Sequence, residues 1–445
     1  MTKPPQSDAL TLIGTAVTWL FLSLVLIMQI TPPSALAQAL PAAEAAPIST
    51  GFALPRTAGT LQYAVSASES LSWGFYGNQG ADSATNLTGD VAYISNSKRD
   101  PFSMIFSGGH SWTNSGQPSY TYLNLGLSQV LALGRWNFVL SDSVSYLPGT
   151  PTTGLSGVPG VGDLGVAPVQ VGGDTDQGVL TNFSTRVTNT AAASLVRQLT
   201  AKTSISASGT YSTMSFLGNS DANQGLDSTS KAGSASLSHQ LDARNSLGGN
   251  FAYSEFDYSS NGNSMALPSV TGKTLSAQFS RSVTRKLHVS AAGGPQWTSV
   301  GSYQSLSLFA DVSAAYAGQF SHASLTYVRS ANAGSGVAGG AISSGVSFAA
   351  GRTFARVWNC GFTSAYTQSS NLPLPGVASY SFRTTIAGVQ VSRAIARSLS
   401  GYANYTLENQ SNSGAGNAVD VFNGLSQFVG FGLTFSPSSL HFGRQ

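Results

Sequence analysis

Charged side chains are scarce in this sequence, which has 21 Lys and Arg and 18 Asp and Glu among 445 residues. A soluble globular domain is about one quarter charged, so much of the folded surface is expected not to face water. Long hydrophobic runs are also lacking after Ile30, where no segment approaches the roughly 20 apolar residues of a membrane-spanning helix. Only a closed β-barrel satisfies every backbone group in lipid without helices. The two absences together predict such a barrel.

Cysteine occurs once, at Cys360, which excludes an intrachain disulfide framework and a thiolate metal site. Cys360 alternates with Trp358 and Phe362, so we expect it to be a small lipid-facing residue. The His residues are dispersed, at His110, His239, His288, His322 and His441. Barrel proteases and phospholipases need Ser, His and acidic groups gathered at one rim. We therefore expect no catalytic residues, no metal site and no cofactor.

Nucleic-acid binding is disfavoured because no basic patch is interleaved with aromatic residues. The expected partners are membrane lipids and small solutes.

The N-terminus has the features of a secretion signal. Lys3 precedes an apolar stretch from Leu10 to Ile30, and Ala35-Leu36-Ala37 forms a small-x-small cleavage pattern. We predict a signal peptide over residues 1–37 and a short periplasmic lead over 38–59. An uncleaved membrane anchor is the alternative, because 21 apolar residues is long for a signal core. The rest divides into a barrel over residues 60–436 and a C-terminal tail over 437–445.

A hairpin unit recurs every 33 to 43 residues, as in LVRQLTAKTSISASGTYS, LSHQLDARNSLGGNFAYS and FSRSVTRKLHVSAAGG. Tight turns are expected near Arg99, Gly134, Ala201, Ala243, Arg285, Gly318, Thr353 and Ala396. A propeller blade would need four short strands per unit, whereas each unit here holds two long ones. Period-2 alternation between the turns predicts an all-β, antiparallel, up-and-down transmembrane barrel of about 18 strands, with 16 as the alternative.

Apolar residues alternate with Ser, Thr, Asn, Gln and Gly along most of these strands, as in Leu123-Leu125-Leu127 and Val429-Phe431-Leu433. Apolar-out and polar-in alternation is typical of a barrel around a water-filled lumen. The five Trp after Ile30 lie near predicted strand ends, at Trp73, Trp112, Trp136, Trp297 and Trp358. Because indole prefers the bilayer interface, this placement predicts two aromatic belts.

On its signal peptide, hairpin repeat and aromatic belts, the chain resembles the large Gram-negative outer-membrane β-barrels, in particular the putative β-barrel porin families. The resemblance covers nearly all of the mature chain. It implies a location in the cell outer membrane, insertion by the barrel assembly machinery, and a homotrimer as a candidate oligomeric state. One departure is the C-terminus, where the last alternating aromatic residue, Phe435, is followed by SPSSLHFGRQ.

Acidic residues gather in the predicted long loops, which contain no Lys or Arg. The nine loops are 77–86, 113–118, 148–178, 217–228, 259–270, 299–304, 331–340, 368–376 and 410–424. Their acidic residues are Asp82, Asp163, Asp174, Asp176, Asp221, Asp227 and Asp420. The short turns are mostly basic. We predict an acidic extracellular mouth that concentrates cations, although Asp also suits turns and Arg also snorkels at interfaces.

The longest loop, 148–178, mixes Pro with Gly. Loops of this length are commonly functional or disordered. We expect it to fold into the lumen as a constriction, with a surface flap as the alternative.

Five charged residues are predicted to line the pore: Arg186, Asp311, Arg383, Asp142 and Glu69. Alternation places the first three opposite the lipid-facing side. It groups Glu69 with Leu71, and Asp142 with Phe138 and Val144. A β-bulge would be needed to turn Glu69 and Asp142 inward.

The predicted function is a passive diffusion channel for small hydrophilic solutes, because 18 strands leave an aqueous lumen whereas eight are filled by side chains. Few lumen charges indicate weak selectivity. The alternative is a closed structural or export-associated barrel that acts with partners, for example in polysaccharide secretion.

Overall fold

The structure is a computed structural model that describes residues 59–74, 81–95, 97, 100–114, 119–147, 185–217, 227–259, 268–332, 341–355, 357–372, 380–414 and 423–442. These residues all belong to the compact unit Ala43–Gln445. The predicted signal peptide and nearly all of the lead lie outside the described residues, as does loop 148–178. No helix among the described residues is long and apolar enough to cross a membrane.

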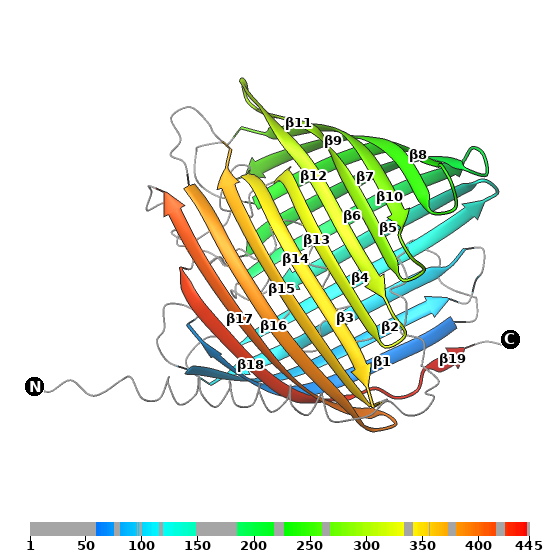
Figure 1. Cartoon of the computed structure of the whole chain (residues 1–445). Coiled ribbons are helices and arrows are strands. Elements are labelled where there is room, and N and C mark those ends of the chain that lie inside the picture. Colours follow the sequence, from blue (N-terminus) through cyan, green and yellow to red (C-terminus); the bar gives the residue numbers. More distant parts are fainter. Residues whose placement is uncertain are drawn as a thin grey trace, which may run out of the picture. The chain divides into compact units, whose positions relative to one another are not determined.

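The described fold is entirely β-structure (Figure 1). The strands are β1 Gly59–Trp73, β2 Ala81–Ser95, β3 Phe102–Thr113, β4 Tyr120–Leu133, β5 Trp136–Leu147, β6 Thr185–Gln198, β7 Thr203–Leu217, β8 Asp227–Gln240, β9 Asn245–Ser259, β10 Val270–Ser282, β11 Leu287–Val300, β12 Tyr303–Ala317, β13 Ser321–Asn332, β14 Ala341–Phe354, β15 Trp358–Asn371, β16 Tyr380–Ala396, β17 Leu399–Gly414, β18 Gly424–Phe435 and β19 Leu440–Phe442.

Each of the strands β1 to β18 pairs antiparallel with its neighbours in sequence, and β1 pairs with β18, so the sheet closes on itself. The short β19 also pairs with β1 and lies in line with β18, so the barrel has 18 strands around its circumference. The predicted closed barrel is confirmed, with 18 strands rather than the alternative of 16. The connections from β2 to β3 and from each following even-numbered strand to the next, up to β16–β17, all fall at or within a few residues of the predicted turns.

Strand β19 lies within the segment that we predicted as a C-terminal tail. Val65 of β1 pairs with Phe435, and Leu61 pairs with Leu440. Four positions separate the two residues on β1 but five separate their partners, so one extra residue is accommodated between β18 and β19, as in a β-bulge. Pro437 lies in this interval and has no N–H for the ladder. The closing strand therefore continues beyond Phe435.

Three short turns share one hydrogen-bonding pattern, which explains the repeat seen in the sequence. Thr200 Oγ1 accepts hydrogen bonds from the N–H groups of Lys202 and Thr203. Thr284 does the same for the residues two and three positions later. Asp242 Oδ1 takes this role in the β8–β9 turn, where it accepts from the N–H groups of Arg244 at 2.7 Å and Asn245 at 2.9 Å. Such side chains mimic a backbone turn.

The connection between β11 and β12 differs from the prediction. We expected a longer loop over 299–304, but Val300 pairs directly with Tyr303 and only Gly301 and Ser302 connect the strands. Gly301 has a φ of +57°, which a two-residue hairpin requires and Gly allows without steric cost. The loop prediction failed here because strand pairing runs to the very end of the hairpin.

The turn residue Asp242 gives a pH-dependent prediction. The side-chain amide of Asn245 and the N–H of Arg244 hold the pKa of the Asp242 carboxyl below its usual value. A group with a lowered folded pKa stabilises the fold above its unfolded pKa, and the stabilisation is lost as the pH falls through the folded value. Asp242→Ala should therefore lower the unfolding free energy at pH 7, and the difference from wild type should begin to shrink below about pH 4 and continue to shrink as the pH falls through the lower folded pKa. Urea unfolding across pH measures this.

Thr284→Ala is the matched control for Asp242→Ala. It removes an equivalent pair of hydrogen bonds from a side chain that does not titrate. Its effect on stability should therefore be the same at pH 7 and pH 3. If the Asp242→Ala effect also persists unchanged at pH 3, the ionised carboxylate contributes nothing to the turn.

Candidate solute pathway

The two faces of the barrel wall differ in chemistry. Residues paired across a ladder lie on the same face, and successive residues alternate between faces. On β1, Ser66, Ser68 and Ser70 are buried whereas Val65 and Leu71 are exposed. The same alternation can be followed from strand to strand around the barrel. Most of the large apolar side chains that are exposed then lie on the outward face, and the hydroxyl-bearing residues lie on the inward face. The predicted apolar-out, polar-in pattern is thus present, and it defines the lumen wall.

Hydroxyl groups on the inward face bond to each other across neighbouring strands. The pairs Ser206–Ser236, Ser208–Ser234, Ser246–Ser280 and Ser290–Ser313 have oxygen–oxygen distances of 2.6 to 2.7 Å. Mutual bonding satisfies these polar groups without a formal charge. These hydroxyl pairs on β7 to β12 therefore offer neutral donors and acceptors to whatever passes the lumen.

Charges on the inward face of the described strands are few. The acidic ones are Asp82, Asp90, Asp311 and Glu408, and the basic one is Arg186. Asp90 and Glu408 were not among the predicted pore residues, and they are 3% and 7% exposed. Alternation alone could have identified both, because Asp90 lies between Gly89 and Val91 on β2, and Glu408 follows Leu407 on β17.

Of the five predicted pore residues, the register places Arg186 and Asp311 on the inward face. Arg186 pairs with Phe216, which is buried on the lumen side of β7. Asp311 alternates with Leu308 and Val312, which are exposed outward. These positions follow from strict alternation.

Arg383 is placed on the outward face, contrary to our expectation. The register of β15–β16 is continuous and pairs Arg383 with Gln368, two positions from the outward pair Tyr366–Thr385. Phe382 and Ile386 are the buried, inward residues of β16. An alternation that treats these two apolar residues as lipid-facing would place Arg383 in the lumen, which is the reverse of the observed faces. Arg383 lies close to the long-loop end of its strand, where a snorkelling guanidinium reaches water.

Glu69 and Asp142 also lie on the outward face, because no β-bulge occurs at either position. The ladders on both sides of each residue run without a register shift. Each carboxylate has a polar neighbour instead: Thr85 Oγ1 donates to Glu69 Oε1 at 2.7 Å, and Asn189 Nδ2 donates to Asp142 Oδ1 at 2.9 Å. Local hydrogen bonds, rather than a change of face, compensate these two charges in part.

A further charged cluster on the outward face was not predicted. Lys231 Nζ on β8 lies 2.9 Å from Asp257 Oδ2 and 3.6 Å from Glu255 Oε1, both on β9. The Tyr253 hydroxyl donates to Glu255 at 3.3 Å. The cluster is invisible in the sequence because its members come together only through the β8–β9 register.

The five Trp lie at strand ends on the outward face. Trp73, Trp112 and Trp297 are at the long-loop end, and Trp136 and Trp358 at the short-turn end. The Arg197 guanidinium carbon is 4.7 Å from the Trp136 ring centre, and that of Arg393 is 5.1 Å from the Trp358 ring centre. Such cation–π pairs suit an interface that is apolar on one side and wet on the other.

The predicted acidic mouth falls only in part on described residues. Asp82 lies at the long-loop end of β2, on the inward side. Asp227 begins β8, and its Oδ1 accepts from the N–H of Phe216 at 2.7 Å. Asp163, Asp174, Asp176, Asp221 and Asp420 lie outside the described residues. Within the part of the chain that the structure describes, no cluster of three or more His, Cys, Asp or Glu could hold a metal ion.

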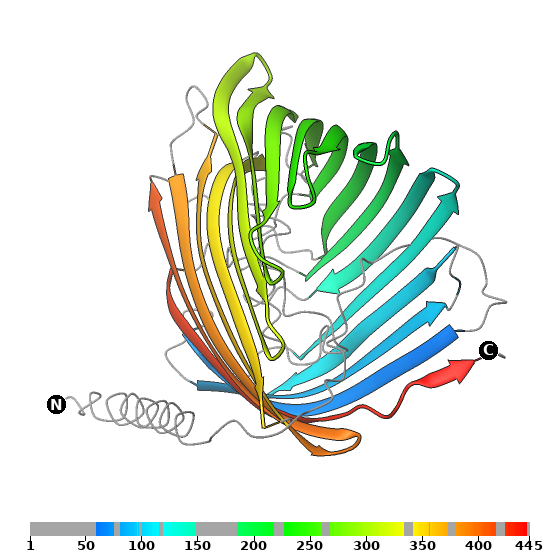
Figure 2. The same cartoon turned by 45° about the vertical axis from the view of Figure 1, so that its right-hand side comes forward.

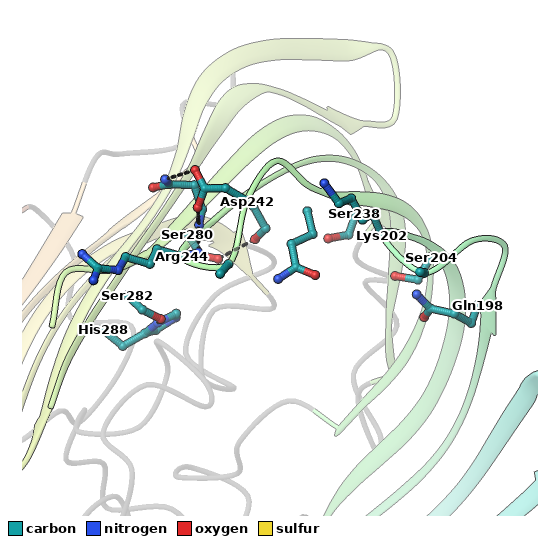
Figure 3. A pocket seen from close by; sticks show the side chains of 14 residues that line it. Gln198, Lys202, Ser204, Ser238, Asp242, Arg244, Ser280, Ser282 and His288 are labelled. Atoms are coloured by element: carbon teal, nitrogen blue, oxygen red, sulfur yellow. Dashed lines mark hydrogen bonds between the residues drawn. The ribbon is translucent and has the colours of Figure 1, made fainter. Parts of the chain in front are cut away.

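A pocket of about 330 Å³ lies at the short-turn end of the wall, between β6 and β11 (Figure 3). It is lined by inward polar side chains and by the turns of β6–β7 and β8–β9, which contribute Lys202, Asp242 and Arg244. The pocket is polar, and charges of both signs are found only at its turn side. It continues the neutral, hydroxyl-rich lumen wall to the rim.

Comparisons with known proteins give a likeness of arrangement only. No family model matches the chain, and no curated protein matches its sequence. Among solved structures, it is similar to Pseudomonas aeruginosa OpdK with vanillate, with 11% identity and a TM-score of 0.43 over 86% of this chain and 99% of that one. P. aeruginosa OccK2 (OpdF) in complex with glucuronate has 11% identity and a TM-score of 0.42, over 85% and 98%. Acinetobacter baumannii OccAB3 has 10% identity and a TM-score of 0.42, over 85% and 99%.

The chain's own strand pairing defines its class. A closed antiparallel barrel of 18 strands, with exposed apolar side chains outside and hydroxyl groups inside, is a Gram-negative outer-membrane β-barrel. The location is accordingly the outer membrane.

Proposed function

We propose that this barrel is a passive diffusion channel for small hydrophilic solutes. The observation that carries the proposal is the inward wall, where Ser hydroxyls bond to one another and few charges interrupt them. Neutral hydroxyls exchange hydrogen bonds with water and with polar solutes without holding either tightly. Such a wall suits weak selectivity and passage rather than tight binding.

The acidic mouth and the constriction are finer parts of the same proposal. The inward acidic residues outnumber the inward basic residue among the described strands, which supports a slight preference for cations. Loop 148–178, between β5 and β6, is long enough in sequence to reach into the lumen and narrow it. Insertion by the barrel assembly machinery and a homotrimeric state remain predictions of the resemblance.

Single-channel conductance of the purified, refolded full chain in a planar bilayer tests the proposal. We expect steady, large openings, and a reversal potential under a salt gradient that shows a slight preference for cations. A silent protein that is still heat-modifiable and protease-resistant would contradict an open channel. That result would instead favour the closed, partner-dependent barrel.

A further inference from the structure

The barrel wall is interrupted near the long-loop end of β12 and β13. The last paired residues of this ladder are Ala310 and Arg329. The same register would next pair Phe309 with Ser330, Leu308 with Ala331 and Ser307 with Asn332. None of these three pairs forms, although all six residues belong to strands. The unpaired stretch is three residues on each strand, about 10 Å long.

The sequence Gly293-Gly294-Pro295-Gln296 on β11 accounts for this interruption. Gly294, Pro295 and Gln296 are the β11 partners of the three β12 residues that do not pair with β13. On the other side of β11, the β10–β11 ladder also lacks the pairs at Gly294 and Pro295. Proline has no N–H to donate, and a Cβ at Gly294 would collide with the carbonyl oxygen of Leu275. The β11–β12 hairpin rises above the neighbouring strands (Figure 2).

A side chain bridges the interruption in place of a backbone ladder. The N–H of Ala331 on β13 donates to Gln296 Oε1 on β11 at 2.9 Å, past the intervening strand β12. Unpaired backbone at membrane depth is tolerated only where protein or a water-filled cavity satisfies it. Trp297 indicates how deep the interruption lies in the membrane, because Trp297 belongs to the outer aromatic belt and pairs with Leu306 of β12. On β12 the interruption therefore lies just below the outer belt, and on β13 it comprises the last three residues of the strand.

Apolar side chains border the interruption on both sides of the wall. At the long-loop ends of β9, β10 and β11, the residues Tyr258, Val270 and Val300 form a buried cluster with Leu372, and Ile342, the β14 partner of Ala331, packs against this cluster. On the outward side, Leu306 and Leu308 are 67% and 59% exposed, more than any other large apolar residue that the structure describes. Apolar side chains thus lie next to the interruption on both faces of the wall.

We propose that this interruption is a lateral opening that connects the lumen with the outer leaflet. Its substrate class is a small molecule with a largely apolar surface, which would enter at the mouth, cross the cluster of Tyr258 and Val300, and leave past Leu308 into lipid. The lateral opening is a second route beside axial diffusion. It goes beyond the proposed channel function and can be measured separately from it.

A cross-link across the lateral opening tests the inference. The variant carries Cys360→Ala, so that the only thiols are those introduced by Ser307→Cys and Asn332→Cys. A short bifunctional maleimide then cross-links these two cysteines on intact cells that carry the assembled full chain. The probe is N-phenyl-1-naphthylamine, an uncharged apolar dye that fluoresces in lipid. Bridging should lower dye uptake several-fold and leave single-channel conductance unchanged. The control is the same cross-link between Ala315→Cys and Ser324→Cys, where the β12–β13 ladder is intact. This cross-link should change neither dye uptake nor single-channel conductance.

A second variant needs no thiol chemistry. Pro295→Thr restores an N–H and a β-branched side chain to β11 and should lower dye uptake, whereas Pro101→Thr, at a short turn, should not. The inference is overturned if verified bridging leaves dye uptake unchanged, or if dye uptake and conductance fall together, because the dye would then use the axial route. Normal dye uptake by folded Pro295→Thr would also overturn it.

Discussion

Reversing an inward charge should change the ion preference of the channel. Asp311→Arg changes the charge of the lumen wall by two units. A unit charge acts on a monovalent ion 10 Å away in water with about 0.4 kcal/mol. Reversal therefore shifts the cation-to-anion permeability ratio by about 1.6 kcal/mol without salt, about fifteenfold, and by a few-fold at 0.1 M salt, where the Debye length is about 10 Å. The change should favour anions.

Arg186→Asp should shift the same ratio in the opposite direction, toward cations. Reversal potentials under a salt gradient measure both variants. The matched control is Arg383→Asp, which reverses an equal charge on the outward face and should leave the ratio within error of wild type. If Arg383→Asp shifts selectivity as strongly as Arg186→Asp, the assignment of faces on β16 is wrong.

Replacing loop 148–178 with a short Gly-Ser linker should raise single-channel conductance several-fold. The loop connects β5 and β6, and chain folded into a lumen of 18 strands removes cross-section that ions would otherwise use. The size limit for neutral sugars, measured by liposome swelling, should rise with it.

Shortening the β17–β18 connection over 415–423 is the control for the loop replacement, and it should leave conductance unchanged. Unchanged conductance after replacement of 148–178 would show that this loop lies outside the lumen as a surface flap. It would leave the channel itself untouched.

Local signals were sufficient for the barrel as a whole. The turns predicted near Ala201, Ala243 and Arg285 are formed by Thr200, Asp242 and Thr284, whose side chains bond to backbone two and three residues away. Interactions of that range are contained in a short stretch of sequence. For the same reason the alternation placed Arg186 and Asp311 on the lumen side.

Pore residues were misassigned where local signals conflict. The segment around Arg383 has apolar residues on both faces, Phe382 and Ile386 inward and Val389 and Val391 outward. Either face could be lipid-facing on hydrophobicity alone. The ladder with β15 decides between them, because Arg383 must share a face with Gln368. A β-bulge was assumed for Glu69 and Asp142 to avoid charge in lipid, but hydrogen bonds from Thr85 and Asn189 meet that need instead.

The sequence by itself determined the class of this protein, a strand number of about 18 and the position of nearly every connection. These follow from the scarcity of charge, from period-2 alternation and from turn residues, all of which act over a few neighbouring positions. Only the tertiary structure decided the face of Arg383, the Lys231 cluster and the interruption between β12 and β13. Those depend on the register between strands, and register is a property of two segments together that neither sequence contains alone.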